Sequence, residues 1–221
     1  MAVRPEISNA VQDYAKAIWS LGQRDEEPVS TSALADRLEV SPASASAMVK
    51  RLEAMGLVEH QPYHGVTLTP SGERVALEVV RHHRLLELYL AEALGMSWDR
   101  VHEEAEVLEH AISPALSELI AAKLGNPTHD PHGDPIPTAD GEIDETPTSA
   151  LADLEPGSTG VFVRVSDSDP DMLRYLADRG IAPGDRFEVL EREPFEGPLT
   201  VVFGGQAHVL GGALTRAMRT V

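Results

Sequence analysis

The chain contains no cysteine, and no stretch of it approaches 18 uncharged apolar residues. Without cysteine, disulfide bonds and every metal site that needs a thiolate ligand are excluded. Without a long apolar run, a membrane-spanning helix is excluded as well. The first residues, MAVRPEISNAVQDY, also lack the apolar core of a secretory signal. We therefore expect a cytoplasmic protein.

Basic side chains are scarce too, because 18 Lys and Arg stand against 36 Asp and Glu, for a net charge of −18. Such a charge argues at first against binding to nucleic acid. The acidic residues are unevenly distributed, however, and residues 1–76, with seven basic and ten acidic side chains, are the least acidic part. Bound cations could neutralise part of the remainder. The length of 221 residues suits one large domain or two to three small ones.

The first 75 residues predict a winged helix-turn-helix. Helical spacing of apolar residues predicts a first helix within residues 6–22. A second helix should begin at Ser30 or Thr31, and a third at Ser41 and Pro42, because hydroxyl side chains cap helices and proline suits the first turn. Gly56 is a suitable end for the third helix. The alternating residues that follow predict two strands around Tyr63, His64 and Gly65.

The third of these helices begins with small and polar residues, so it could enter a DNA major groove closely. Lys50 and Arg51 would then lie near phosphates. Alternatively, the small residues only permit tight packing between helices. The candidate DNA-binding residues are Ser41, Ala43, Ser44, Ser46, Lys50 and Arg51.

The middle of the chain predicts three amphipathic helices, over residues 71–95, 101–112 and 113–125. Their apolar faces exceed what a small domain can cover, which favours a homodimer. In the segment VHEEAEVLEHAI, a rotation of about 100° per residue puts the histidines and Glu106 and Glu109 on one side, opposite Val107, Leu108, Ala111 and Ile112. The apolar side is expected to pack. The acidic side is either a solvated face or a set of ligands, and the spacing alone leaves both open.

Residues 126–150 are rich in Pro, Gly and Asp and have no periodicity. They predict a linker that is at best partly ordered. The residues after them predict short strands interrupted by one helix, consistent with a small five-stranded barrel.

Several motifs together resemble the diphtheria toxin repressor family, which comprises metal-dependent transcriptional repressors of bacteria. They are QDYAKAIWSL, RHHRLLE, VHEEAEVLEH and GNPTHDPHGDPIP, with the winged helix-turn-helix between the first two. The resemblance covers essentially the whole chain and is strongest to the manganese transport regulators of actinobacteria. It implies a mainly α fold with β structure that binds operator DNA as a homodimer. The implied parts are a DNA-binding domain at 1–75, a helical dimerisation and metal-binding domain at 76–126, a linker at 127–150 and an SH3-like (FeoA-like) β-barrel at 151–221.

The same resemblance implies metal ligands and a metal. Iron-type members of the family carry Met at the position of Asp13 and Cys at the position of Glu106, whereas both positions are carboxylates here. Hard oxygen ligands suit Mn²⁺, so the resemblance implies manganese, with Fe²⁺, Co²⁺ or another divalent ion as the alternative. The family's ligand positions correspond to Asp13, His83, Glu87, His102, Glu106, Glu109 and His110.

One departure concerns Lys16, because the two-domain manganese regulators carry a second carboxylate there. A closely spaced metal pair is therefore not expected, and a separate second site is. Besides Glu87, its candidate ligands are Asp130, His132, Asp167 and Asp169, with loop acids and a solvated histidine as the alternative. The remaining histidines are expected on the surface or in ordinary packing; they are His60, His64, His82, His129 and His208.

Two other classes of function compete with that of a metal-dependent repressor. The segment EVLEH is similar to the H-x-x-E-H motif of inverted zinc proteases, but Glu106 stands where a histidine ligand is required. Only one helix is dense enough in ligands for a di-iron carboxylate bundle. We therefore predict no enzyme. An iron-responsive repressor of the same family and a winged-helix regulator that senses a non-metal ligand stay open as alternatives.

Overall fold

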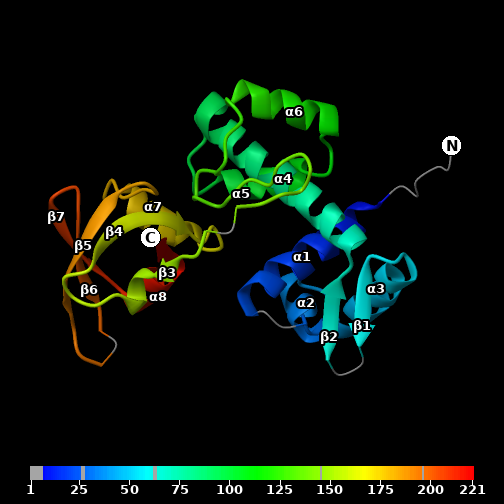
Figure 1. Cartoon of the computed structure of the whole chain (residues 1–221), viewed down its shortest axis with the longest axis horizontal. Helices are drawn as coiled ribbons and strands as arrows, with labels where there is room; N and C mark the ends of the chain where they lie inside the picture. Colours follow the sequence, from blue (N-terminus) through cyan, green and yellow to red (C-terminus); the bar gives the residue numbers. More distant parts are fainter. Residues whose placement is uncertain (1–6, 26–27, 62–63, 145, 196) are drawn as a thin grey trace. The chain divides into compact units, whose positions relative to one another are not determined.

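The structure, a computed structural model, describes residues 7–25, 28–61, 64–144, 146–195 and 197–221 (Figure 1). They form two compact units, which are described separately. The first unit contains the chain up to His82 together with Glu109–Ile112 and Pro137–Glu142. The second contains His83–Leu108, Ser113–Ile136 and Ile143–Val221. Among the described helices, none has the length and apolar character needed to cross a membrane.

The first unit contains the predicted winged helix-turn-helix. Ser30 caps the second helix by accepting a hydrogen bond from the Ala33 amide, and Ser41 caps the third in the same way through Ser44. The antiparallel wing pairs Val58 with Leu68, while Tyr63 of the predicted turn lies outside the described residues. The elements are α1 (Asn9–Asp25), α2 (Thr31–Arg37), α3 (Pro42–Ala54), β1 (Val58–Gln61) and β2 (Gly65–Leu68).

These five elements share one hydrophobic core. Val11 and Ile18 of α1, Leu34 of α2, Val49 of α3 and Val66 of β2 all belong to it. Each of these side chains is at most 2% exposed. Burial of one large aliphatic side chain contributes about 1.5–3 kcal/mol, so α1 is held firmly against the helix pair.

Three helices of the middle region are α4 (Pro70–Leu94), α5 (Val101–Leu108) and α6 (Pro114–Lys123). Helix α5 is shorter than predicted, because the chain leaves the helix after Leu108 and Glu109 begins a turn. Within one chain, the buried residues of α5 are Val101 and Ala105, whereas Val107 of the predicted packing face is 73% exposed. The helical projection assumed about 100° of rotation per residue up to Ile112. Because the helix ends at Leu108, the projection does not give the direction of the side chains after that residue.

The chain ends in a six-stranded antiparallel sheet with strand order β3-β8-β4-β5-β6-β7. This confirms the SH3-like fold class, but the expected five-stranded barrel is wrong in strand number. β3 and β8 have only two and three residues, too few for an alternating pattern to stand out in the sequence. The elements are β3 (Ser149–Ala150), η1 (Leu151–Asp153), β4 (Thr159–Val165), α7 (Pro170–Ala177), β5 (Arg186–Arg192), β6 (Leu199–Phe203), β7 (Gln206–Leu210), α8 (Gly212–Ala217) and β8 (Met218–Thr220).

The part of the predicted linker between Asp130 and Ile136 is anchored by hydrogen bonds. The expectation that the linker is at best partly ordered is therefore wrong for this part. The Asp130 carboxylate accepts hydrogen bonds from the backbone amides of His132 and Asp134, and Arg84 of α4 donates to the Pro135 carbonyl. Gly133 has φ +87°, and a Cβ there would lie 1.9 Å from the carbonyl oxygen of Val163. Only glycine allows this loop to approach β4 so closely.

Candidate metal centre

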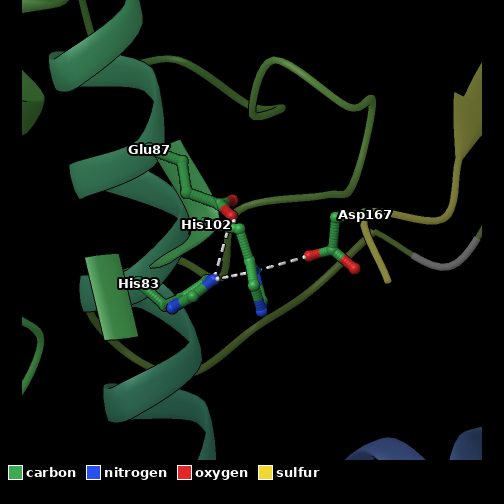
Figure 2. Close-up of side chains that lie close together, drawn as sticks. All are labelled: His83, Glu87, His102 and Asp167. Atoms are coloured by element: carbon green, nitrogen blue, oxygen red, sulfur yellow. Dashed lines mark hydrogen bonds and ion pairs between the residues drawn. The ribbon is translucent and has the colours of Figure 1, made fainter. Parts of the chain in front are cut away.

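Four side chains of the second unit direct nitrogen or oxygen atoms at one point (Figure 2). His83 and Glu87 are four residues apart on α4, so one helix face presents both. His102 comes from the first turn of α5, and Asp167 from the segment after β4. The His83 Nε2 atom lies 2.9 Å from Glu87 Oε1 and 3.1 Å from His102 Nδ1. The same His102 atom lies 3.2 Å from Glu87 Oε1 and 3.0 Å from Asp167 Oδ2.

The charges in this cluster depend strongly on one another. Burial would lower the pKa of His102, but its contacts with Asp167 and Glu87 outweigh burial and raise that pKa to about 10. Burial would likewise raise the pKa of Asp167, yet His102 lowers it to about 2. For Glu87, burial is outweighed by the nearby imidazoles, led by His83, so its pKa falls well below the usual value. Both carboxylates are therefore ionised at neutral pH, and they attract positive charge to this point.

A second group adjoins the first, because Glu87 directs its other oxygen toward His132. Glu87 Oε2 and His132 Nδ1 are 3.8 Å apart, and in the described part of the chain neither atom has a hydrogen-bond partner. Asp130 is close enough to complete a group of three ligands with them. His132 Nε2 is held at 2.7 Å from the Trp98 carbonyl oxygen, to which it donates. Buried polar atoms without partners are costly, and a cation between them would satisfy both.

A separate cluster lies in the first unit and consists of Asp13, Glu109 and His110. Asp13 belongs to α1, while the other two follow the end of α5. His110 Nε2 lies 2.8 Å from Asp13 Oδ1 and 3.6 Å from Glu109 Oε1. On the opposite side of the ring, His110 Nδ1 donates to Gln12 Oε1 at 2.7 Å, which leaves Nε2 facing the two carboxylates. Metal-binding histidines are commonly oriented by such a hydrogen bond.

Lys16 lies beside this cluster, one turn after Asp13 on α1. Its Nζ atom is 2.7 Å from Glu109 Oε2 and 3.0 Å from Oε1, so the ammonium group contacts both oxygens. The Glu109 side chain is fully buried. A buried carboxylate needs such compensation, because an unpaired charge is strongly disfavoured there.

The other predicted ligands have different surroundings. Glu106 is a partly buried residue of α5 whose Oε1 lies 3.7 Å from His102 Nε2. Asp169 is the N-cap of α7, where its Oδ1 accepts from the amides of Asp171 and Met172. Of the remaining histidines, His82 is buried, and burial lowers its pKa. His208 is buried in the sheet, whereas His64 and His129 are exposed and His60 is partly exposed.

The predicted DNA-binding residues all lie on α3 or at its cap. Ala43, Ser44, Lys50 and Arg51 are exposed, and Ser46 is partly buried. The Ser41 hydroxyl caps the helix and also lies 2.8 Å from the Ser44 hydroxyl. Two of the three serines thus already have partners within the helix cap.

Sequence reasoning missed the roles of Gln12, Lys16 and Trp98. Gln12 orients His110, Lys16 pairs with Glu109, and the Trp98 carbonyl orients His132. The two side-chain partners are separated by 98 and 93 residues in sequence, so no local spacing could have indicated them. The one local signal was that Gln12 and Lys16 lie within one helical turn of Asp13. This proximity does not indicate which residue each of them contacts.

Three family models match the chain in succession. Residues 6–66 match the N-terminal DNA-binding domain of iron-dependent repressors, residues 69–138 their metal-binding and dimerisation domain, and residues 150–218 the FeoA domain.

Individual proteins match over nearly the whole length. The iron-dependent repressor IdeR of Mycobacterium tuberculosis is 31% identical over 216 residues, which cover 92% of this chain and 93% of that protein. A manganese-dependent transcriptional repressor solved in complex with manganese is 47% identical, with a TM-score of 0.89 over 96% of this chain and 99% of the other. ScaR with bound Zn²⁺ is 28% identical, with a TM-score of 0.80 over 96% and 98% of the two chains.

These matches agree with the geometry described above. The winged helix-turn-helix, the clusters of histidines and carboxylates on and after the helices of the middle region, and the SH3-like sheet occur in the order of the three family models. The chain belongs to the diphtheria toxin repressor family and is a metal-dependent transcriptional repressor.

Proposed function

We propose that this repressor responds to Mn²⁺ and binds double-stranded operator DNA as a homodimer. The observation that carries the proposal is the convergence of His83, Glu87, His102 and Asp167 through nitrogen and oxygen atoms alone. Their four contact distances run from 2.9 to 3.2 Å. These are hydrogen-bond and ion-pair distances, and they bring the four donor atoms close enough together to share one cation. Imidazole nitrogen and carboxylate oxygen, without any sulfur, are ligands that suit Mn²⁺.

We assign two metal sites to each subunit. One consists of Asp13, Glu109 and His110. Glu106 stays a ligand that is expected from the family resemblance. The other is built on Glu87, whose two oxygens face different partners: His83 and His102 on one side, Asp130 and His132 on the other, with Asp167 beside His102. Asp169 is left out of the assignment because its carboxylate caps α7.

The Asp13 site links metal binding to DNA binding through α1. Asp13 is on the same helix as Val11 and Ile18, which pack in one core with α2 and α3. Asp13, Glu109 and His110 would hold a divalent ion, whose positive charge would offset the repulsion between the two carboxylates. Because α3 packs in the same core as α1, holding α1 also holds α3, the proposed recognition helix. The two α3 helices of a dimer can then meet successive half-sites on the DNA. A coupling of about 1–3 kcal/mol between metal and DNA binding is ordinary for such a switch.

The homodimer is supported by apolar side chains that a single chain leaves in water. Val107 of α5 and Leu116 and Leu119 of α6 are 73%, 44% and 68% exposed. They belong to the region that matches the family's dimerisation domain. Clusters of exposed large apolar residues commonly mark protein interfaces. We therefore assign α5 and α6 to the dimer contact.

A DNA mobility-shift titration with Mn²⁺, Fe²⁺, Co²⁺ and Zn²⁺ under anaerobic conditions tests the proposal. We expect operator binding to require metal, and Mn²⁺ to activate fully. His110→Ala and His102→Ala are the site variants. His129→Ala is the matched control, since His129 is exposed and its ring contacts the neighbouring Thr128 hydroxyl. Operator binding that is unaffected by a chelator would overturn the proposal.

A further inference from the structure

We propose that Lys16 is a built-in counter-ion that sets the metal affinity of the site formed by Asp13, Glu109 and His110. The inference rests on the proposed function of that site as a metal-binding site. Lys16 itself carries no lone pair when charged, so it cannot be a ligand. Its ammonium group instead contacts the Glu109 carboxylate, which is also a proposed metal ligand.

The contacts of Lys16 show this competition directly. Nζ lies 2.7 Å from Glu109 Oε2 and 3.0 Å from Oε1, and Oε1 is the oxygen that faces His110 Nε2 at 3.6 Å. The ammonium therefore contacts the same oxygen that faces His110. Its side chain is 14% exposed and that of Glu109 is 0% exposed, so little water screens the pair. Interactions between charges are considerably stronger in such surroundings than in water.

Two consequences follow from this arrangement. In the metal-free protein, Lys16 compensates the buried charge of Glu109. In the metal-bound protein, a divalent cation and the ammonium lie on the same small carboxylate and repel each other, which weakens metal binding. The repressor then fills this site only at higher metal concentration. Because the repulsion depends on charge alone, it weakens the binding of every divalent metal to a similar degree.

The effect of Lys16 on metal affinity is opposite to that of a residue that only orients a ligand. A side chain that only orients a ligand strengthens metal binding, and its loss weakens affinity about ten- to a hundredfold. Removal of a counter-ion strengthens metal binding instead. The direction of the change therefore separates the two roles.

The experiment uses the full-length chain with the second site disabled by Glu87→Gln and His102→Ala. Glu87 is shared by both halves of that site, and neither residue belongs to the cluster of Asp13, Glu109 and His110. Mn²⁺ affinity is measured by competition with a chromophoric chelator. In this background we compare Lys16→Gln, which keeps a hydrogen-bond donor and removes the charge, with Lys16→Arg, which keeps the charge. Lys123→Gln is the control for loss of one positive charge elsewhere, because Lys123 is exposed at the end of α6.

We expect Lys16→Gln to bind Mn²⁺ at least about tenfold more tightly, and Co²⁺ and Zn²⁺ to gain by a similar factor. Lys16→Arg and Lys123→Gln should stay within about threefold of the background. Thermal unfolding in chelator should show a lower Tm for Lys16→Gln and a larger rise in Tm on addition of Mn²⁺. If Lys16→Gln is too unstable to titrate at room temperature, the same comparison is made at 4 °C, with Lys16→Met as a second neutral variant.

Unchanged or weaker affinity in the neutral variants would overturn the role of Lys16 while the metal site stands. A different result bears on the site itself: if the background binds no Mn²⁺, or if its binding survives Asp13→Ala with His110→Ala, the proposed site is wrong whatever Lys16 does.

Discussion

The rings of Trp98 and His132 stack, and the His132 ring also donates a hydrogen bond to the Trp98 backbone. Their ring centroids are 5.8 Å apart with an interplanar angle of 21°, and the Trp98 carbonyl oxygen accepts the hydrogen bond from His132 Nε2. Trp98 also packs against the hydrophobic core of the SH3-like sheet. The indole thus connects that core to a ligand of the proposed second metal site.

This contact makes Trp98 a reporter of the second site. The only other tryptophan is Trp19 of α1, so Trp19→Phe leaves Trp98 as the single indole. We expect Mn²⁺ to change the fluorescence of this variant, because binding at His132 alters the ring on which the indole stacks. The change should be lost when His132→Ala is added. A metal-dependent signal that persists without His132 would contradict the assignment of this ligand.

The pair His102 and Asp167 predicts a specific pH dependence of stability in the metal-free protein. The pKa of His102 is raised to about 10, so its stabilising contribution is full below its unfolded value of about 6.5 and is lost as the pH rises toward 10. The pKa of Asp167 is lowered to about 2, so its contribution is present above about 3.8 and is lost as the pH falls toward 2. The pair should therefore stabilise most between about pH 4 and pH 6.5.

Urea unfolding of the parent and of Asp167→Asn in chelator, from pH 4 to pH 10, measures this contribution. The difference in the free energy of unfolding should be largest near pH 5 and should shrink steadily above pH 6.5. Asp169→Asn is the control for a nearby carboxylate, because Asp169 caps α7 and lies outside the described clusters. A difference that grows toward alkaline pH would show that the contact does not raise the pKa of His102.

The choice of metal should depend on the two carboxylates at Asp13 and Glu106. Mn²⁺ binds a given site more weakly than Fe²⁺, Co²⁺ or Ni²⁺, so selection needs a ligand set that suits it. Asp13→Met combined with Glu106→Cys replaces two hard oxygens by soft sulfur. We expect half-maximal activation of DNA binding to shift toward Fe²⁺, Co²⁺ or Ni²⁺, and the Mn²⁺ response to weaken. Identical rank orders of the metals for parent and variant would refute the argument from ligand softness.

Contacts to the DNA backbone should come from the exposed end of α3. Lys50 is exposed there, so Lys50→Ala should weaken binding to all sequences alike and reduce the salt dependence of binding by about one unit of slope. Lys123→Ala, also exposed but on α6, is the matched control and should leave the slope unchanged. If Lys50→Ala leaves the slope unaltered as well, Lys50 does not contact phosphates.

Local sequence signals were sufficient to predict the helices of the DNA-binding part. Ser30, Ser41 and Pro42 start helices where expected, and Gly56 follows the end of α3 with φ +70°. These signals work because a cap or a turn depends on residues no more than a few positions apart. Resemblance to the family supplied the candidate ligand residues, and the absence of cysteine already excluded thiolate ligands.

Only the tertiary structure decided how those ligands are grouped. The sequence placed His102 and His110 on one helix face, but α5 ends at Leu108, and the two histidines belong to different clusters. Likewise, nothing near Lys16 in sequence indicates that it pairs with Glu109, 93 residues away. A helix end and a long-range ion pair both depend on the packing of distant segments, so side chains with the same local signals can acquire different partners once the chain has folded.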